Sequence, residues 1–404
     1  MKNAFLILAI VWLTANNCFT QSISDTLLSP VILIDQEDSV ALPVDTIITS
    51  QILAIPDSIY IKRLSTLPFE FKMTYNPIVK SYIELYTVKI KDKLEIIIGL
   101  SDFYFPIFDE VLKAYQLPNE LKYIPIIESA LNPRAVSRAH AVGLWQFMRT
   151  TGKENGLAIG NSIDERRGLI ESTRAAAKLL KKLYGMYHDW PLVLAAYNCG
   201  SGNVNKAIRR SGGKRDFWEI YKHLPRETRG YVPGYIGAAY AFNYYKEHNI
   251  NPVPTVLPLQ MDTILIHKNL HFMQIAEVLG VDIDVLRKLN AQYLKDIVPA
   301  TTKKSYVLHI PLDQKMKFVQ LKDSIYAYHR TQYKNEFERQ NYQAAIVTSG
   351  NGQRVVHRVR SGESIWIIAG QYKVTVNSIK EWNNISGSGS KIRPGQKLIV
   401  YTRI

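Results

Sequence analysis

Residues 117–130, LPNELKYIPIIESA, place one carboxylate, Glu128, directly behind a run of apolar residues. Apolar surroundings disfavour the ionised form of a carboxyl group and therefore raise its pKa. A glutamic acid that keeps its proton near neutral pH is suited to general acid catalysis. A lone Glu at a helix end is more often a solvated charge, so the interpretation of Glu128 depends on the segments around it.

The region around this stretch has the pattern of a helical domain. Apolar residues recur at spacings of three or four, as one buried helix face requires. Ser162 and Glu165 match a capping box, which satisfies the free amides at a helix start. We predict an all-α domain of several short helices over residues 76–250. The two clearest apolar series are Ile83, Tyr86, Ile90, Leu94 and Ile97, and Ala175, Leu179, Leu183 and Tyr187.

Three further segments of this region combine aromatic and amide side chains with glycines. They are AVGLWQFM (141–148), AAYNCGSG (195–202) and ETRGYV (227–232). Aromatic rings stack on sugar rings, and a Gln amide pairs with hydroxyl and acetamido groups. Taken singly, each segment is equally well explained by core packing or helix capping.

In this order the four segments closely resemble the catalytic domain of lytic transglycosylases of the soluble type. The layout of the whole chain resembles the membrane-bound lytic murein transglycosylase D family. The fold implied is lysozyme-like. Arg149, where the family usually has Pro, and Cys199 are small departures. By resemblance Glu128 is the catalytic acid/base, Ser129 orients it, Gln146 contacts substrate, Tyr197 and Asn198 line the cleft, and Glu227 and Tyr231 close the site.

The resemblance implies non-hydrolytic cleavage of peptidoglycan between N-acetylmuramic acid and N-acetylglucosamine, leaving 1,6-anhydro-muramic ends. One carboxylate would then act first as acid and then as base. A hydrolytic muramidase is the alternative and needs a second carboxylate. Asp164 and Glu165 look like helix-start acids, which leaves Glu227 as the candidate. A non-catalytic peptidoglycan-binding protein is the alternative from another class.

Two later segments share a strand-helix-helix-strand order, which marks an internal repeat. Residues 355–402 contain GESI (362–365) and IRPGQKL (392–398), and they resemble a LysM carbohydrate-binding module. Residues 259–312 resemble a degenerate copy that lacks these turns, with a polar linker at 313–354 between the two. The expected fold is therefore multidomain, with two small α+β modules behind the helical domain. The residues of the module expected to bind glycan are Gly362, Glu363, Ser364, Asn383, Pro394 and Gly395.

The first residues read as an export signal followed by an extended leader. Residues 1–20 contain Lys2, a short apolar run and a small-x-small cleavage site, and residues 21–75 contain β-prone patches broken by prolines. We expect export to the periplasm or cell envelope, with outer-membrane association left open. Lipidation at Cys18 is disfavoured because Asn16 and Asn17 precede it.

The balance of charge points to an anionic partner. The 404 residues carry a formal net charge of +15, without long basic blocks. Export argues against nucleic acid, so peptidoglycan strands are the expected partner. No histidine pair has metal-ligand spacing with a carboxylate partner, and we expect no metal, no cofactor and a monomer.

Overall fold

The computed structural model describes residues 55–333, 353–360, 362–372, 374–383, 385 and 392–402. The expected signal peptide, the leader up to residue 54 and residues 334–352 of the expected linker lie outside these ranges. The chain divides into two compact units. The first contains residues up to Asp262 together with Asp284–Leu294 and His309–Leu312, and the second contains the remainder.

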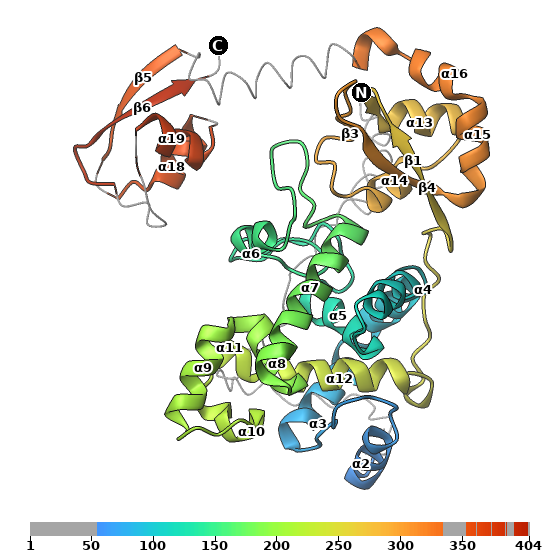
Figure 1. Cartoon of the computed structure of the whole chain (residues 1–404), viewed down its shortest axis with the longest axis vertical. Coiled ribbons are helices and arrows are strands. Elements are labelled where there is room, and N and C mark those ends of the chain that lie inside the picture. The colour runs from blue at the N-terminus through green and yellow to red at the C-terminus, as the bar shows by residue number, and fades with distance from the viewer. Residues whose placement is uncertain are drawn as a thin grey trace, which may run out of the picture. The chain divides into compact units, whose positions relative to one another are not determined.

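The first unit is helical, as the apolar periodicity predicts (Figure 1). A π-helical turn, Leu85–Lys89, joins the helices Pro77–Glu84 and Lys91–Ala114, and a 3₁₀ turn, Asn119–Tyr123, precedes the helix Ile124–Ser129. The α-helices are α2 (Asp57–Ser65), α3 (Pro77–Glu84), α4 (Lys91–Ala114), α5 (Ile124–Ser129), α6 (Arg149–Glu154), α7 (Leu169–Tyr187), α8 (Trp190–Cys199), α9 (Ser201–Arg210), α10 (Phe217–Ile220), α11 (Arg226–Arg229) and α12 (Tyr231–Asn243).

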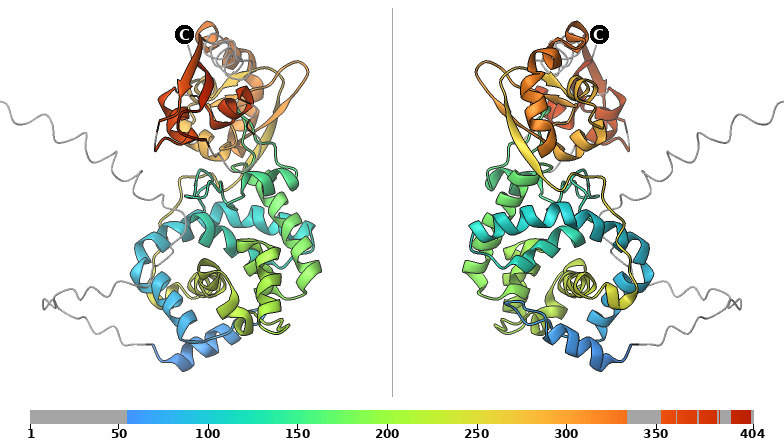
Figure 2. Two further views of the ribbon diagram at one scale, coloured as in Figure 1. Left: turned by 90° about the vertical axis from the view of Figure 1, so that its left-hand side faces the viewer. Right: turned by 90° about the vertical axis from the view of Figure 1, so that its right-hand side faces the viewer.

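Helix α12 lies at the centre of this unit, ringed by other helices in Figure 2. Every residue from Tyr231 to Phe242 is buried. A helix that is apolar on all sides is stable only when it is enclosed in this way. Gly237 allows α3 to approach, because a Cβ at this position would lie 2.8 Å from the backbone carbonyl carbon of Tyr82. The start of α12 is thereby fixed, and it carries Tyr231 into the site described below.

Two segments expected to be irregular are helical. The prediction of an extended leader was wrong for Asp57–Ser65, which forms α2 with Tyr60 and Leu64 buried. Arg63 of this helix donates a 2.7 Å hydrogen bond to the Tyr240 hydroxyl. Helices this short are marginal alone, so the contacts with α12 stabilise a segment whose composition gave no helical signal.

The linker prediction was wrong in the same way over its first part. Helices α15 (Lys315–Gln320) and α16 (Lys322–Ala327) lie within it and bury Phe318 and Ile325. One buried apolar side chain per short helix is too weak a pattern to stand out in a polar stretch.

The capping box expected at Ser162 and Glu165 is absent, because α7 begins only at Leu169. Ser162 instead accepts a backbone hydrogen bond from Leu294, and the amide of Asp164 donates to Gln292. Ile163 and Tyr293 form an isolated antiparallel bridge. Residues 162–164 are therefore strand-like and pair with residues 292–294 of the same compact unit.

The first expected repeat contains the predicted strand, helix, helix, strand order. Strands β1 and β4 form one two-stranded sheet, and β2 and β3 form another. Helix α13 begins with a capping box made by His271 and Gln274. The elements are β1 (Met261–Ile266), β2 (Leu270–His271), α13 (Phe272–Leu279), α14 (Ile283–Leu289), β3 (Ile297–Val298) and β4 (Tyr306–Pro311).

The second repeat follows the same plan. Strands β5 (Gln353–Arg358) and β6 (Lys397–Thr402) pair antiparallel, with Val355 opposite Val400. Helices α18 (Ile365–Gln371) and α19 (Val376–Trp382) lie between them in sequence. A small apolar core, including Ile365, Ile368, Ile379 and Leu398, closes the module. Across the described residues, none of the helices is both long and apolar enough to span a membrane.

Candidate active site

Glu128 lies at the end of α5, where the chain turns sharply. Pro125 occupies the first turn of this helix, where the backbone N–H that proline lacks would have no partner within the helix. Ala130 and Leu131 follow with φ values of 51° and 60°, in the left-handed region that ends the helix. Non-glycine residues in this conformation are uncommon and frequently occur at functional sites. The Glu128 side chain is buried, with 7% of the residue exposed.

The carboxyl group of Glu128 accepts one hydrogen bond from a distant helix. The Tyr231 hydroxyl donates to its Oε1 atom across 2.6 Å. Burial raises the pKa of Glu128 to about 7, although the Tyr231 hydrogen bond lowers it in part. Because desolvation dominates, Glu128 is poised to hold or release a proton near neutral pH.

Two tyrosines near Glu128 stay protonated and act as donors. Burial first, and then the Glu128 charge, raise the pKa of Tyr231 well above its usual range. The same two causes raise the pKa of Tyr197. Tyr197 donates a 2.7 Å hydrogen bond to the Trp145 carbonyl, so its ring is fixed against the 141–148 segment. The structure thus brings Glu128, Tyr197 and Tyr231 together.

Ser129 supports the site through the main chain. Its buried hydroxyl lies 2.9 Å from the Leu144 carbonyl and 3.0 Å from the Pro125 carbonyl. These contacts join the end of α5 to the segment that carries Trp145 and Gln146. Ser129 therefore fixes the backbone on both sides of the site, and no hydrogen bond joins it to the Glu128 carboxylate.

Gln146 is held in a strained turn. Its φ is 46°, and its amide donates a 2.8 Å hydrogen bond to the Gly143 carbonyl. The neighbouring Trp145 is fully buried and donates to the Thr173 hydroxyl across 2.9 Å. Trp145 is therefore a core residue, whereas Gln146 is half-buried and remains accessible to a substrate.

Asn198 and Glu227 are exposed and less directly connected to Glu128. Asn198 accepts a 2.8 Å hydrogen bond from Thr228, which joins the end of α8 to α11. Glu227 lies on α11 and makes no contribution to the pKa shift of Glu128. Of the two acidic residues expected at a helix start, Glu165 accepts a hydrogen bond from the Ala158 amide.

The other acid, Asp164, belongs to a buried ion pair that the sequence did not reveal. Its carboxylate lies 2.7 Å from Arg166, and both side chains are 8% exposed. Arg166 also donates to the carbonyls of His140 and Phe147. The pair therefore holds both ends of the segment that carries Gln146. An arginine two residues from an aspartate was the available signal, but charged neighbours of this kind are common on surfaces.

The expected glycan-binding residues of the second repeat mostly shape its turns. Gly362 and Gly395 have φ values of 85° and 86°, and Ser364 caps α18. Glu363 accepts from the Arg360 amide and from His357, and these bonds hold the pKa of its carboxyl below the usual range. Pro394 is exposed beside Gly395.

Asn383 has a structural role that recurs in both repeats. Its amide donates to the Ile379 and Ile399 carbonyls and accepts from the Ile399 amide, which ties α19 to β6. Asn290 makes the equivalent bonds to Leu286 and His309 in the first repeat. The side-chain amide of Asn383 is thus used by these structural hydrogen bonds, which argues against a direct role of Asn383 in sugar binding.

Two exposed apolar residues of the second repeat were missed by the sequence reasoning. Trp366 is 60% exposed and Ile367 is 55% exposed, both on α18. An exposed indole of this size is typical of binding surfaces, whereas a single exposed aliphatic side chain is common on any protein surface. Their position directly after the GESI turn was the available signal.

Comparison with known families identifies the class of each part. Residues 106–220 match the family model described as "Transglycosylase SLT domain". Residues 260–327 match "Lytic transglycosylase MltD, LysM-like domain", and residues 357–400 match "LysM domain". The chain thus combines a transglycosylase SLT domain with LysM domains, which confirms the resemblance drawn from the motifs.

Among individual proteins, the chain is 30% identical over 293 residues to membrane-bound lytic murein transglycosylase D of Escherichia coli K12. This alignment covers 72% of the chain and 61% of the relative, so the chain spans about three fifths of that protein. Membrane-bound lytic murein transglycosylase F of Pseudoalteromonas translucida is 32% identical over 133 residues, covering 29% of the chain and 28% of the relative. The solved 70 kDa soluble lytic transglycosylase of Escherichia coli aligns over 36% of the chain and 24% of its own, with 26% identity and a TM-score of 0.31.

Proposed function

We propose that this chain is a peptidoglycan lytic transglycosylase in which Glu128 is the single acid/base. The observation that carries the proposal is the state of Glu128. It is buried, its pKa is raised to about 7, and it is bonded to the Tyr231 hydroxyl. A protonated carboxylic acid in a desolvated position is suited to protonate a glycosidic oxygen.

The reaction proceeds in two proton transfers. Glu128 gives its proton to the oxygen that bridges N-acetylmuramic acid and N-acetylglucosamine, and the bond from that oxygen to muramic C1 breaks. The C6 hydroxyl oxygen of the same muramic residue then bonds to C1, with assistance from the acetamido group. Glu128 takes the hydroxyl proton, so the acid is regenerated and a 1,6-anhydro ring is closed.

Tyr231 would hold the carboxyl group in position, Tyr197 would line the cleft, and Gln146 would contact substrate. Asn198 and Glu227 are proposed at the rim. We also propose that residues 1–20 direct export to the periplasm or envelope and that peptidoglycan is the partner. The catalytic domain would span residues 76–250, and the two modules residues 259–312 and 355–402.

The hydrolytic alternative needs a second carboxylate beside Glu128, and the observed contacts disfavour it. Asp164 is paired with Arg166, Glu165 binds a backbone amide, and Glu227 is exposed. Within the described residues, only burial and Tyr231 account for the pKa shift of Glu128.

The test is a mass spectrum of the muropeptides released from purified sacculi. We expect anhydro-muramic ends from the wild type, and a loss of cleavage by about 10²- to 10⁴-fold in Glu128→Gln. Glu227→Gln serves as the matched control, and its products are expected to keep anhydro ends. Reducing ends from the wild type would contradict the proposal and favour the muramidase. Cleavage by Glu128→Gln at the wild-type rate would rule out the assignment of the acid.

A further inference from the structure

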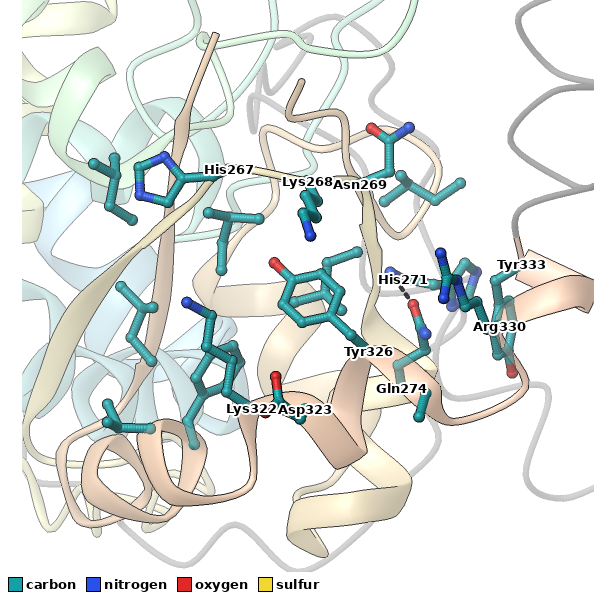
Figure 3. A pocket seen from close by; sticks show the side chains of 18 residues that line it. His267, Lys268, Asn269, His271, Gln274, Lys322, Asp323, Tyr326, Arg330 and Tyr333 are labelled. Carbon is teal, nitrogen blue, oxygen red and sulfur yellow. Dashed lines mark hydrogen bonds between the residues drawn. The ribbon is translucent and has the colours of Figure 1, made fainter. Parts of the chain in front are cut away.

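The second unit contains a cavity that the transglycosylase chemistry does not use. Its volume is about 750 Å³, and it lies between β1 with the residues that follow it and the helices α15 and α16 (Figure 3). Both walls belong to one unit of the chain. The helices α15 and α16 are additions to the strand-helix-helix-strand plan of the repeat. The cavity exists because of them, so its role needs an explanation.

The cavity is built on a fixed frame. Gln274 is 4% exposed and donates to the carbonyls of Ile325 and Tyr328, which holds α16 against α13. Lys317 donates a 2.7 Å hydrogen bond to the Leu279 carbonyl, which holds α15 in the same way. The two helices that form one wall are therefore held by hydrogen bonds to α13, of which the Gln274 bond to Ile325 is buried.

The lining combines apolar surface with unpaired positive charge. Ile266 and Phe318 are buried at its base, whereas Leu265 and Val319 are 55% and 57% exposed. The cationic side chains that line it are Lys268, Lys322 and Arg330. Throughout the described ranges none of these three forms an ion pair, and Asp323 is the one carboxylate among the lining residues.

Two of the cationic side chains face the same part of the cavity. Lys268 and Lys322 extend toward the same space, with the Tyr326 ring between them (Figure 3). Arg330 lies beside His271, whose ring stacks on Tyr333 with centroids 4.4 Å apart (Figure 3). A ligand that extends along the cavity would meet Lys268, Lys322 and the Tyr326 hydroxyl in one part of it, and Arg330 in another.

We propose that this cavity binds the peptide stem of peptidoglycan through the stem's free carboxylates. The proposal rests on the function proposed above, which makes peptidoglycan the substrate. Cationic side chains that line one cavity without counter-ions favour an anionic ligand, and carboxylates form strong charge-assisted hydrogen bonds with Lys and Arg. The glycan itself offers neutral hydroxyls, which would leave these charges uncompensated.

Two features favour a peptide over a phosphate-bearing surface. Asp323 lies next to Lys322, where it would repel a phosphodiester chain but attract the ammonium group of a diamino acid in the stem. A recessed cavity with apolar walls also fits a few small residues such as alanine, whereas a flat membrane surface cannot enter it.

The test uses the full chain with Glu128→Gln, which prevents turnover, and isothermal titration with the free tetrapeptide L-Ala-D-Glu-diaminopimelate-D-Ala. We expect Lys322→Ala and Arg330→Ala each to weaken binding about tenfold, as the loss of one charge-assisted hydrogen bond implies. Lys303→Ala removes an exposed lysine outside the cavity and is the matched control, with unchanged affinity expected. The tetrapeptide with amidated carboxylates is expected not to bind.

Each other outcome contradicts the proposal in a distinct way. Absent tetrapeptide binding, or equal affinity in Lys322→Ala, Arg330→Ala and Lys303→Ala, would overturn it. A third outcome would reassign the cavity to phosphate groups: the Lys303→Ala control binds vesicles of anionic phospholipid, Lys322→Ala does not, and neither binds the tetrapeptide. Anhydro products from the wild type without tetrapeptide binding would overturn this inference alone, whereas tetrapeptide binding without anhydro products would overturn only the proposed reaction.

Discussion

At Glu128 the demands of catalysis and of folding oppose each other. Its pKa rises from an ordinary 4.5 to about 7 in the folded state, so the folded protein binds this proton more tightly than the unfolded chain does. Its favourable contribution is complete below pH 4.5 and is lost as the pH rises through about 7. A pKa shift of this size corresponds to a loss of about 3 kcal/mol of folding stability above pH 7, relative to low pH.

Glu128→Gln is therefore expected to unfold at higher denaturant concentration than the wild type at pH 8, by up to about 3 kcal/mol in stability. The difference should vanish near pH 4, where the wild-type carboxyl is protonated in both states. Urea unfolding at the two pH values measures this. Equal stability of variant and wild type at pH 8 would show that burial does not raise the pKa of Glu128.

Tyr231→Phe tests the other influence on this carboxyl group. The Tyr231 hydrogen bond stabilises the ionised form, so its loss is expected to raise the Glu128 pKa further. Because Glu128 must be protonated to act as the acid, activity falls as the pH rises through its pKa. The alkaline limb of the pH profile should then move up by about one pH unit. A limb that stays in place in Tyr231→Phe would contradict this role, whatever the change in rate.

The sequence indicated Glu128 more readily than its partners. The three apolar residues before Glu128 indicated a carboxyl group beside apolar surface, and the resemblance of the four segments was needed to single it out as the acid. Tyr231 lies 103 residues away, and the pairing depends on where α12 begins in the packed domain. Only the resemblance placed Tyr231 near the site, because no local pattern encodes such a contact.

Among the elements, the 141–148 segment depends on one glycine. A Cβ on Gly143 would lie 1.8 Å from the Arg166 carbonyl oxygen, and its φ is 88°. Gly143→Ala is expected to destabilise the protein by about 3 kcal/mol or more and to lower activity, because Gln146 would be displaced. Thermal unfolding and sacculus digestion measure the two effects.

Gly156→Ala is the matched control for this change. Its φ is 95°, but a Cβ there would meet nothing within 4 Å, so it would carry the backbone strain without the collision. We expect a loss of about 1 kcal/mol with activity retained. Equal effects of the two substitutions would mean that backbone conformation, and not the contact with Arg166, fixes this segment.

Predictions from local sequence patterns were wrong where contacts with distant parts of the chain determine the structure. Ser162 and Glu165 have capping-box spacing, but Leu294 and Ala158 donate to them from outside any helix start. Helix α2 was missed because its stability comes from Tyr60 and Leu64 packing elsewhere, and not from its own composition. The long helices were predictable because their apolar stripes are themselves the record of burial.

At the scale of the whole molecule, the two repeats share one structural device although their turn motifs differ. Asn290 and Asn383 make the same bonds between a second helix and a closing strand, although the turn motifs of the second copy are missing from the first. The conserved physical requirement is the satisfaction of buried backbone groups. The fold of the module does not depend on the GESI and IRPGQKL turns, and we expect sugar recognition at the second repeat, which has them.

Removing residues 355–404 should weaken retention on insoluble sacculi while leaving the turnover of short soluble glycan fragments unchanged. A tethered binding module raises the effective concentration of an enzyme at a polymer, so its loss affects only the insoluble substrate. Trp366→Ala is the finer variant, because an exposed indole stacks on sugar rings, and the adjacent Ile367→Ala is the control. Pull-down with sacculi should decrease for the deletion and for Trp366→Ala but not for Ile367→Ala. Unchanged pull-down after the deletion would leave the module a structural role only, and equal losses at Trp366 and Ile367 would point to apolar adhesion without sugar stacking.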